Sequence, residues 1–199
     1  MNNLAFFSIV INFLLGVQTQ LTVQLQSDLS DSLNPKVVLQ PQVLEIKKEV
    51  TGNTFELLTS TTDRVDGICS FDQGGKLESG RAFVFDQVSI GYATNAASGL
   101  EGNIEYDTKA PKELQNAIVI VKQDTREVLR MPFRDLHNIS RAYSTNGNDA
   151  YSQLKALCFL ADNKKVEITV KLAEGVSLPT DVKHYVWLRF NGLQTAKKA

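Results

Sequence analysis

The stretch Val166-Glu167-Ile168-Thr169-Val170-Lys171-Leu172 alternates apolar and polar side chains. Successive side chains of a β-strand point to opposite faces, so this alternation predicts a strand with one face in a core and the other in solvent. After a turn at Gly175 to Pro179, the segment His184 to Phe190 alternates in the same way. The carboxyl end of the chain is therefore expected to be β-structure.

Shorter segments upstream predict further strands. Arg81 to Tyr92 is rich in aromatic and β-branched residues and is apolar on both faces. Ile118 to Val121 and Glu127 to Met131 flank a polar turn, which is typical of a hairpin. Phe55 to Leu58 is expected to be extended, whereas Val43 to Val50 fits either a strand or a short helix.

One internal segment favours a helix. From Ala150 to Leu160 the helical period gathers apolar side chains on one face, and Asn148 or Asp149 is a candidate cap. That face holds Tyr151, Leu154, Leu157 and Cys158.

The segments add up to eight or nine short strands and one or two helices, separated by long irregular loops. No strand–helix–strand alternation typical of a nucleotide-binding parallel sheet is present. We therefore predict an all-β fold, an antiparallel β-sandwich with a single jelly roll and one or two short helices. Residues 1–26 are expected to form an apolar amino-terminal arm that includes the first strand, and residues 27–199 a single β-sandwich domain.

The expected arm carries no formal side-chain charge before Asp28 and begins with the apolar run Leu4 to Val17. That run is shorter than the roughly 20 apolar residues that a membrane-spanning helix needs. A secretory signal normally carries Lys or Arg near its start, whereas the first basic residue here is Lys36. Val17-Gln18-Thr19 is also a poor cleavage site, although a signal peptide stays open as an alternative.

As a helix, the run has a narrow polar or small stripe formed by Ser8, Asn12 and Gly16. Large apolar side chains occupy the rest of its surface, so the helix needs cover on most sides, from its own core, a neighbouring subunit or a lipid surface. We expect other subunits to supply that cover. The candidate interface residues on the arm are Phe6, Phe7, Ile9, Val10, Phe13 and Leu14.

The residues after this run, Gln20 to Gln26, alternate between apolar Leu21, Val23 and Leu25 and uncharged polar side chains. This predicts a strand. A strand without charges suits burial against another chain, although an ordinary solvated edge strand fits equally well.

Charge and motifs exclude several classes of function. With 21 basic and 22 acidic residues, the net charge of −1 gives no broad positive field for nonspecific nucleic-acid binding, so no direct nucleic-acid contact is expected. Lys197 and Lys198 are interpreted as a solvated tail. Neither His137 nor His184 belongs to a metal-binding spacing, and phosphate-binding and nucleophile motifs are absent. We predict no catalytic residue, metal or cofactor, and therefore no enzyme.

The two cysteines, Cys69 and Cys158, lack the CxxC spacing of zinc or redox sites. Cys158 stands in an apolar context that favours a buried, reduced thiol, although a disulfide between the two stays open.

Tyr185 and Trp187 are the sharpest indication of binding, because they share one face of the last strand with Arg189. Aromatic rings spaced by two residues can stack on sugars or anchor a protein interface. They can equally pack beneath other elements of the same chain, so all three interpretations stay open. As candidate interface residues, Tyr185 and Trp187 join those of the arm.

Three segments resemble the jelly-roll coat proteins of tailless icosahedral viruses, particularly phages with an internal membrane. They are Arg81 to Thr94, the hairpin Ile118 to Phe133, and Lys165 to Thr195, in which Leu172 to Pro179 has a strand, a turn and the start of another strand. The family has no diagnostic motif, and the resemblance covers about the last 120 residues.

The resemblance implies a single jelly roll that stands in a shell, with an amino-terminal arm that reaches inward or across to a partner. Because only one jelly roll fits this length, a vertex or minor shell role stays open beside the main lattice. We therefore expect a structural virion protein that acts by self-assembly, with copies of itself or other shell proteins as partners and a possible contact between the arm and an internal membrane. The alternative is a secreted or surface β-sandwich that binds glycan through Tyr185 and Trp187.

Overall fold

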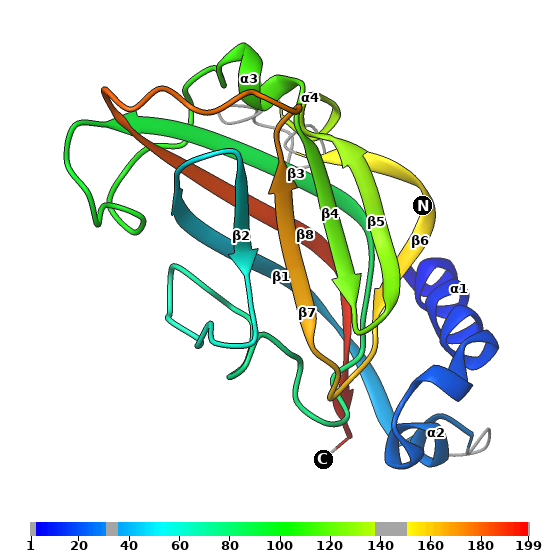
Figure 1. Cartoon of the computed structure of the whole chain (residues 1–199). Helices are drawn as coiled ribbons and strands as arrows, with labels where there is room; N and C mark the ends of the chain where they lie inside the picture. The colour runs from blue at the N-terminus through cyan, green and yellow to red at the C-terminus, as the bar shows by residue number, and fades with distance from the viewer. Residues whose placement is uncertain (1–2, 31–35, 138–150, 199) are drawn as a thin grey trace.

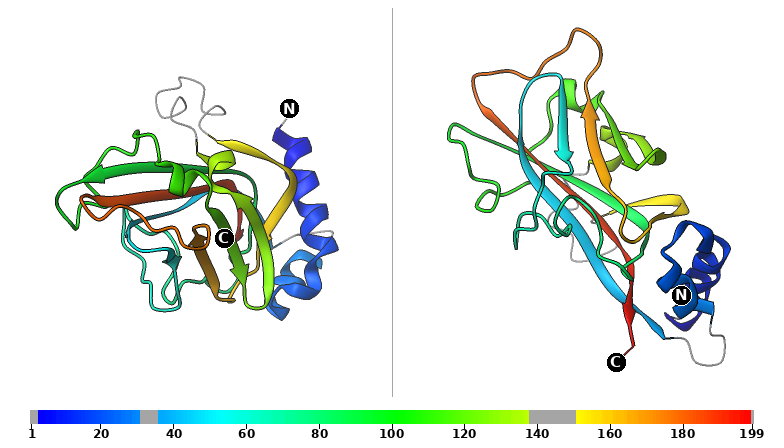
Figure 2. Two further views of the ribbon diagram at one scale, coloured as in Figure 1. Left: turned by 45° about the horizontal axis from the view of Figure 1, so that its top comes forward. Right: turned by 60° about the horizontal axis from the view of Figure 1, so that its bottom comes forward.

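Two antiparallel four-stranded sheets face each other in a computed structural model of the chain, which describes residues 3–30, 36–137 and 151–198 (Figures 1 and 2). The first sheet has the order β1-β8-β3-β6, and the second has the order β2-β7-β4-β5. The strands of the first sheet are β1 (Val37–Val50), β8 (Lys183–Lys197), β3 (Phe83–Asn95) and β6 (Ser152–Leu160). Those of the second are β2 (Thr54–Leu58), β7 (Val166–Lys171), β4 (Ile118–Gln123) and β5 (Arg126–Pro132). The predicted all-β sandwich is confirmed.

The main core lies between the two sheets. Val186, Leu188 and Phe190 of β8 and Ile168 and Val170 of β7 are fully buried there, as the alternation in both segments predicts. The rings of the core also contact one another, with the centroids of Phe85 and Phe190 5.0 Å apart. Burial of these alternating faces is the main force that holds the sheets together.

Several other predicted elements are confirmed. The predicted hairpin forms, with β4 and β5 paired from Ile118 opposite Pro132 to Gln123 opposite Arg126. Val43 to Val50, which fits either a strand or a short helix from the sequence, belongs to β1. Strand β3 is apolar on both faces: Phe83 and Phe85 lie in the main core, and Val84 lies in a second apolar cluster on the outer side of the first sheet.

The predicted helix at Ala150 to Leu160 is wrong, because residues 152–160 form β6 at the edge of the first sheet. The pairing of β6 with β3 shifts register, with Phe85 opposite Cys158 but Gln87 opposite Gln153. This irregularity interrupts the two-residue period and leaves apolar side chains at spacings that resemble a helix. The candidate caps Asn148 and Asp149 lie outside the described residues.

The predicted strand at Gln20 to Gln26 is also wrong. The arm (residues 3–30) consists of α1 (Asn3–Gly16), a 3₁₀ turn (Gln18–Gln20) and α2 (Val23–Ser30). Leu21, Leu25 and Leu29 are buried at a four-residue spacing, whereas Val23 is 81% exposed. Positions i and i+4 share a face in both a helix and a strand, so the short alternation did not separate the two structures.

Two short helices, α3 (Lys112–Gln115) and α4 (Phe133–Leu136), cover one end of the sandwich (Figure 1). Among the described helices, none has both the length and the apolar character required to cross a membrane. Both cysteines are free thiols, so the disulfide between Cys69 and Cys158 is not formed.

Strand β1 is an edge of the first sheet, and only part of it is covered. The backbone N–H of Lys47 donates to the carbonyl of Ile68 (2.8 Å), and the N–H of Ser70 donates to the carbonyl of Glu45 (3.0 Å). Pro41 lies in the other half of the strand, at an odd-numbered position like Glu45 and Lys47, and therefore faces the free side of the ladder. Proline has no N–H to offer there.

Candidate interaction surface

The outer face of the first sheet has two covers. At one end the arm lies against β6 and the neighbouring strands (Figures 1 and 2); we call this the arm end. At the other end, the chain that follows β3, residues 96–109, folds back over Tyr185 and Trp187; we call this the loop end. The outer face is the surface on which all the predicted interface residues converge.

The arm end is apolar. Val10 and Leu14 of α1 are fully buried against the sheet, and the ring of Phe13 packs edge-on to that of Phe159, with centroids 5.7 Å apart. The remaining members of this second apolar cluster come from the arm, from β1, β3 and β8, and from the residues next to β3 and β6: Leu21, Leu25, Leu29, Val37, Val84, Leu193, Ala82 and Ala161. The chain's own sandwich therefore covers one side of the arm.

The opposite side of α1 faces solvent. The small and polar stripe of Ser8, Asn12 and Gly16 is exposed, as is Ala5. Ile9 lies beside this stripe and is 49% exposed. The large side chains at its flanks, Phe6, Phe7, Ile11, Phe13 and Leu15, are half-buried. The exposed strip of α1 thus has small side chains in its centre and apolar ones at its borders.

A buried carboxylate fastens the arm to the sandwich. Asp162, in the turn between β6 and β7, is fully buried and accepts from the backbone N–H of Thr22 (3.0 Å) and from the Thr22 hydroxyl (2.5 Å). It also accepts from the N–H of Gly80 (2.7 Å). The same Thr22 hydroxyl accepts from the N–H of Leu25 (3.4 Å) at the start of α2. One side chain therefore joins three segments that are distant in the sequence.

The loop end is held by hydrogen bonds and aromatic contacts. Tyr185 is fully buried and donates from its hydroxyl to the carbonyl of Ala97 (2.6 Å). Trp187 donates from Nε1 to a carboxylate oxygen of Glu45 (2.7 Å), and its ring centroid lies 5.5 Å from that of Tyr106. Directional contacts therefore predominate at the loop end, whereas at the arm end they are confined to Asp162 and apolar packing predominates.

Two cations lie over the Trp187 ring. Lys47 Nζ is 4.8 Å from the ring centroid, and the guanidinium carbon of Arg189 is 4.1 Å from it. A methyl group added at Gly91 would lie 2.7 Å from Cβ of Tyr106, so glycine is needed beneath this cluster. The ring of Trp187 is thus engaged with its own chain on several sides.

Arg189 lies in the middle of the outer face, between the two ends. Its guanidinium stacks on Tyr151 (5.1 Å) as well as on Trp187, and it donates to the Ser89 hydroxyl (3.1 Å). Burial lowers the pKa of this guanidinium. Nε is buried and has no hydrogen-bond partner within the described part of the chain.

The candidate interface residues fall into two groups. Val10, Leu14 and Tyr185 are fully buried within the chain, so they have no surface to offer a partner in this structure. Ile9 is exposed, and the other four side chains are half-buried: Phe6, Phe7, Phe13 and Trp187. Of these arm residues, Phe6 and Phe13 lie beside Ile9 at helical spacings of three and four residues, whereas Phe7 lies nearer the buried Val10 and Leu14.

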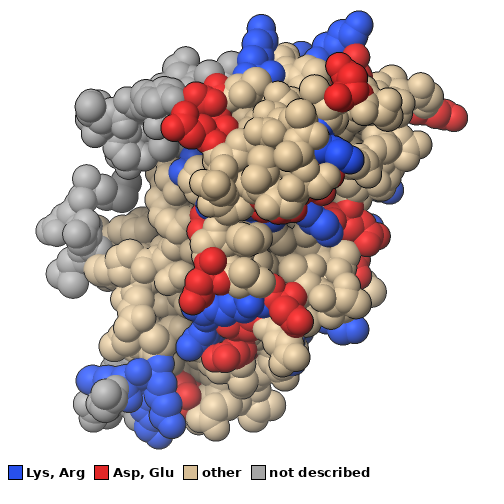
Figure 3. Space-filling view, turned by 90° about the vertical axis from the view of Figure 1, so that its left-hand side faces the viewer, with Lys and Arg blue, Asp and Glu red and all other residues tan. Residues whose placement is uncertain are grey.

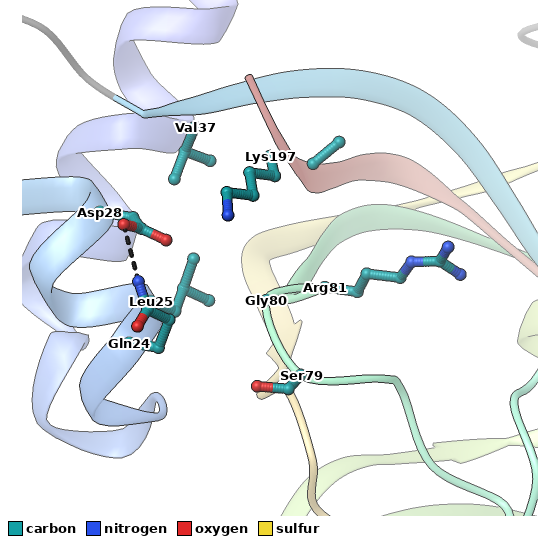
Figure 4. Close-up of a pocket in the computed structure, with 9 residues that line it drawn as sticks. Gln24, Leu25, Asp28, Val37, Ser79, Gly80, Arg81 and Lys197 are labelled. Atoms are coloured by element: carbon teal, nitrogen blue, oxygen red, sulfur yellow. Dashed lines mark hydrogen bonds between the residues drawn. The ribbon is translucent and has the colours of Figure 1, made fainter. Parts of the chain in front are cut away.

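Sequence reasoning missed a cleft between α2 and the sandwich, which we call the α2 cleft (Figure 4). It has a volume of about 400 Å³ and is lined by both Asp28 and Lys197, which lie near opposite ends of the sequence. The other lining residues are Gln24, Leu25, Val37, Ser79, Gly80, Arg81 and Ala196. No sequence signal marked it, because its charged residues come from three distant segments.

Both histidines are engaged in structural hydrogen bonds. His184 Nε2 faces the carbonyl of Pro179 (2.9 Å) and must donate to it, so Nδ1 accepts from the Tyr92 hydroxyl (2.5 Å). Burial raises the pKa of Tyr92 to about 12, which keeps the hydroxyl a donor. Within the described residues, no group of three or more His, Cys, Asp or Glu side chains is placed to hold a metal ion.

Charged side chains of both signs are interspersed over the side of the molecule away from α1 (Figure 3). The arm, by contrast, has no charged residue before Asp28.

The chain matches no protein-family model, no curated protein and no solved structure. The functional argument therefore depends on the geometry of the molecule.

Proposed function

We propose that this chain is a structural subunit of a virion shell, which acts by self-assembly and catalyses no reaction. The observation that carries the proposal is the strand order. Numbered along the chain, the first sheet reads 1-8-3-6 and the second 2-7-4-5. In this order the chain passes between the sheets at every connection except the β4–β5 hairpin. Such crossings support our proposal of a jelly roll, which is built from two Greek keys. Shell proteins of viruses commonly use this fold, although lectins and cupins use it too.

The arm supports assembly over a soluble monomeric role. An isolated exposed apolar side chain is ordinary, but Ile9 is flanked by the half-buried rings of Phe6 and Phe13 on a helix without charge. A second copy of the chain is the partner that we assign to this strip. Contact between uncharged helices from two copies buries the apolar borders without leaving a charge unpaired. A stable interface needs about 800 Å² per partner, so the strip must be joined by neighbouring parts of the arm.

The glycan-binding alternative has less support from the loop end. A ring that stacks on sugar needs a free face, whereas Lys47 and Arg189 both lie over Trp187. Tyr185 is fully buried and has no ring face to offer. We therefore propose a single function, with assembly through the arm.

The assembly state of the full-length chain tests this proposal. We expect analytical ultracentrifugation and electron microscopy to show a large symmetric oligomer, and Ile9→Glu to shift it to smaller species, because a buried charge at the interface would be unpaired. Val65→Glu is the matched control, because Val65 is 48% exposed, almost as much as Ile9, but lies outside the arm. A monomeric wild-type chain, or equal effects of the two substitutions, would contradict the proposal.

A further inference from the structure

We propose that the α2 cleft binds a compact zwitterion of the amino-acid class, with its ammonium group at Asp28 and its carboxylate at Lys197. This site is separate from the assembly surface, since Ile9 and the exposed strip of α1 do not line it. The proposal therefore goes beyond assembly and does not depend on it.

Asp28 is the first part of the argument. It is only 7% exposed, yet its side chain has one hydrogen-bond partner, because the Gln24 amide donates to Oδ1 (3.0 Å). Oδ2 accepts no hydrogen bond from any described residue, and no described Lys, Arg or His lies within 4.0 Å of the carboxylate. The carboxylate therefore has acceptor capacity left for a cation or a donor that enters the cleft. Figure 4 shows the carboxylate directed into the cleft.

Lys197 is the second part. Its amine is directed into the same cleft from the last strand, across from Asp28 (Figure 4). The Ser79 hydroxyl lines the cleft on a third segment and can donate to an anion or accept from a cation. Opposite charges separated by a cleft complement a ligand with both charges, rather than a simple anion or cation.

The remaining lining sets the size and character of the ligand. Arg81 turns its guanidinium away from the cleft, toward Asp72 (3.7 Å) and Glu78 (3.3 Å), and so does not add a second positive charge. Leu25 and Val37 supply an apolar wall. A volume of about 400 Å³ is at the small end of the range for ligand pockets. An amino acid with an aliphatic side chain satisfies both charges and this wall.

Calorimetric titration with three related compounds tests the assignment. L-leucine carries both charges, isoamylamine lacks the carboxylate, and 4-methylpentanoate lacks the ammonium group. We expect L-leucine to bind, and each of the other two to bind at least about tenfold more weakly, because one of the two charged contacts is lost. We expect Asp28→Asn and Lys197→Met each to weaken L-leucine binding by a similar factor.

Glu174→Gln is the control, because Glu174 is an exposed carboxylate in the β7–β8 connection, away from the cleft. It should leave L-leucine binding unchanged. Titration of Ile9→Glu separates this proposal from that of assembly, since binding should persist whatever the size of the oligomer.

Absence of L-leucine binding would overturn the proposal, as would equal affinity for isoamylamine. A direct ion pair between Asp28 and Lys197 is the competing explanation, and a double-mutant cycle on unfolding free energy detects it. Strong coupling between the two substitutions without ligand would show that the pair satisfies itself, and would also overturn the proposal.

Discussion

The arm end and the loop end cover the same face of the same sheet by different means. At the arm end, leucine, valine and phenylalanine side chains pack over Val84 and Leu193, and one carboxylate, Asp162, supplies the polar contacts. At the loop end, hydrogen bonds and stacked rings around Trp187 predominate. Apolar packing is non-directional, and its contribution to stability grows with the area buried. The hydrogen bonds of the loop end instead depend on the distance and angle between particular donor and acceptor groups.

Among the substitutions that test this comparison, Asp162→Ala should lower the free energy of unfolding most. Three donors would lose a charged acceptor worth about 1.5 kcal/mol each, so we expect the free energy of unfolding to fall by about 4.5 kcal/mol. Urea denaturation measures it, with Asp181→Ala, an exposed loop carboxylate, as the control. A loss no larger than that of the control would show that water replaces the carboxylate at no cost.

Leu14→Ala tests the apolar side of the arm end. Leu14 is fully buried, and truncation should cost about 3 kcal/mol through the lost contacts and the cavity that remains. Leu15→Ala, at a half-buried position on the same helix, should cost about 1 kcal/mol. The same urea experiment compares the two. Similar losses for both would mean that α1 does not pack on the sheet by the face described.

Much of the sandwich is predictable from the sequence, and the failures have a common cause. In β7 and β8, one face is in the core and the other is outside it, so alternation identifies the strands. At Leu21 and Leu25 the same apolar spacing serves a helix, and in β6 a register shift hides the alternation. Local pattern cannot separate these cases, because the tertiary partner of each segment decides its structure.

The sites were less predictable than the fold. Asp162 resembles any acidic loop residue in the sequence, yet it is fully buried because residues from two remote segments bond to it. Asp28 and Lys197 meet only because the arm folds back to the end of β8. The alternation of apolar and polar residues within one segment carries no information about such long-range contacts.

Trp187→Phe tests the directional contacts at the loop end. The substitution keeps an aromatic ring for Lys47 and Arg189 but removes the Nε1–H that bonds to the Glu45 carboxylate (2.7 Å). We expect a loss of about 2 kcal/mol in the free energy of unfolding. In a double-mutant cycle with Glu45→Leu, which has no acceptor, most of this loss should appear as coupling. Additive effects would indicate that the hydrogen bond contributes little.

The smallest expected effect is a pH dependence beside the loop end. His137 donates from Nδ1 to the carbonyl of Ile90 (3.0 Å) and accepts at Nε2 from the N–H of Ala110 (3.2 Å). The neutral ring has one donor and one acceptor nitrogen and therefore satisfies both hydrogen bonds. Burial lowers the pKa of His137 below 6.5, although the bond to Ile90 partly opposes the shift. The folded state thus binds fewer protons than the unfolded state as the pH falls.

The contribution of His137 to stability should therefore be complete above pH 6.5 and decline as the pH falls through 6.5 toward the lowered pKa. Unfolding free energies measured across this interval should fall less steeply for His137→Gln, which has no titratable ring. If the free energy of unfolding changed with pH equally in the variant and the wild type, groups other than His137 would cause the pH dependence.

Pro41 has a consequence for how copies of this chain can join. No described strand pairs with the outer edge of this half of β1, so a strand of another molecule could add there, and repeated addition of that kind leads to fibrils. Since Pro41 lacks a hydrogen to donate at that place, the ladder is broken where it would otherwise continue. Addition of a strand from another molecule along this half of β1 is thereby disfavoured.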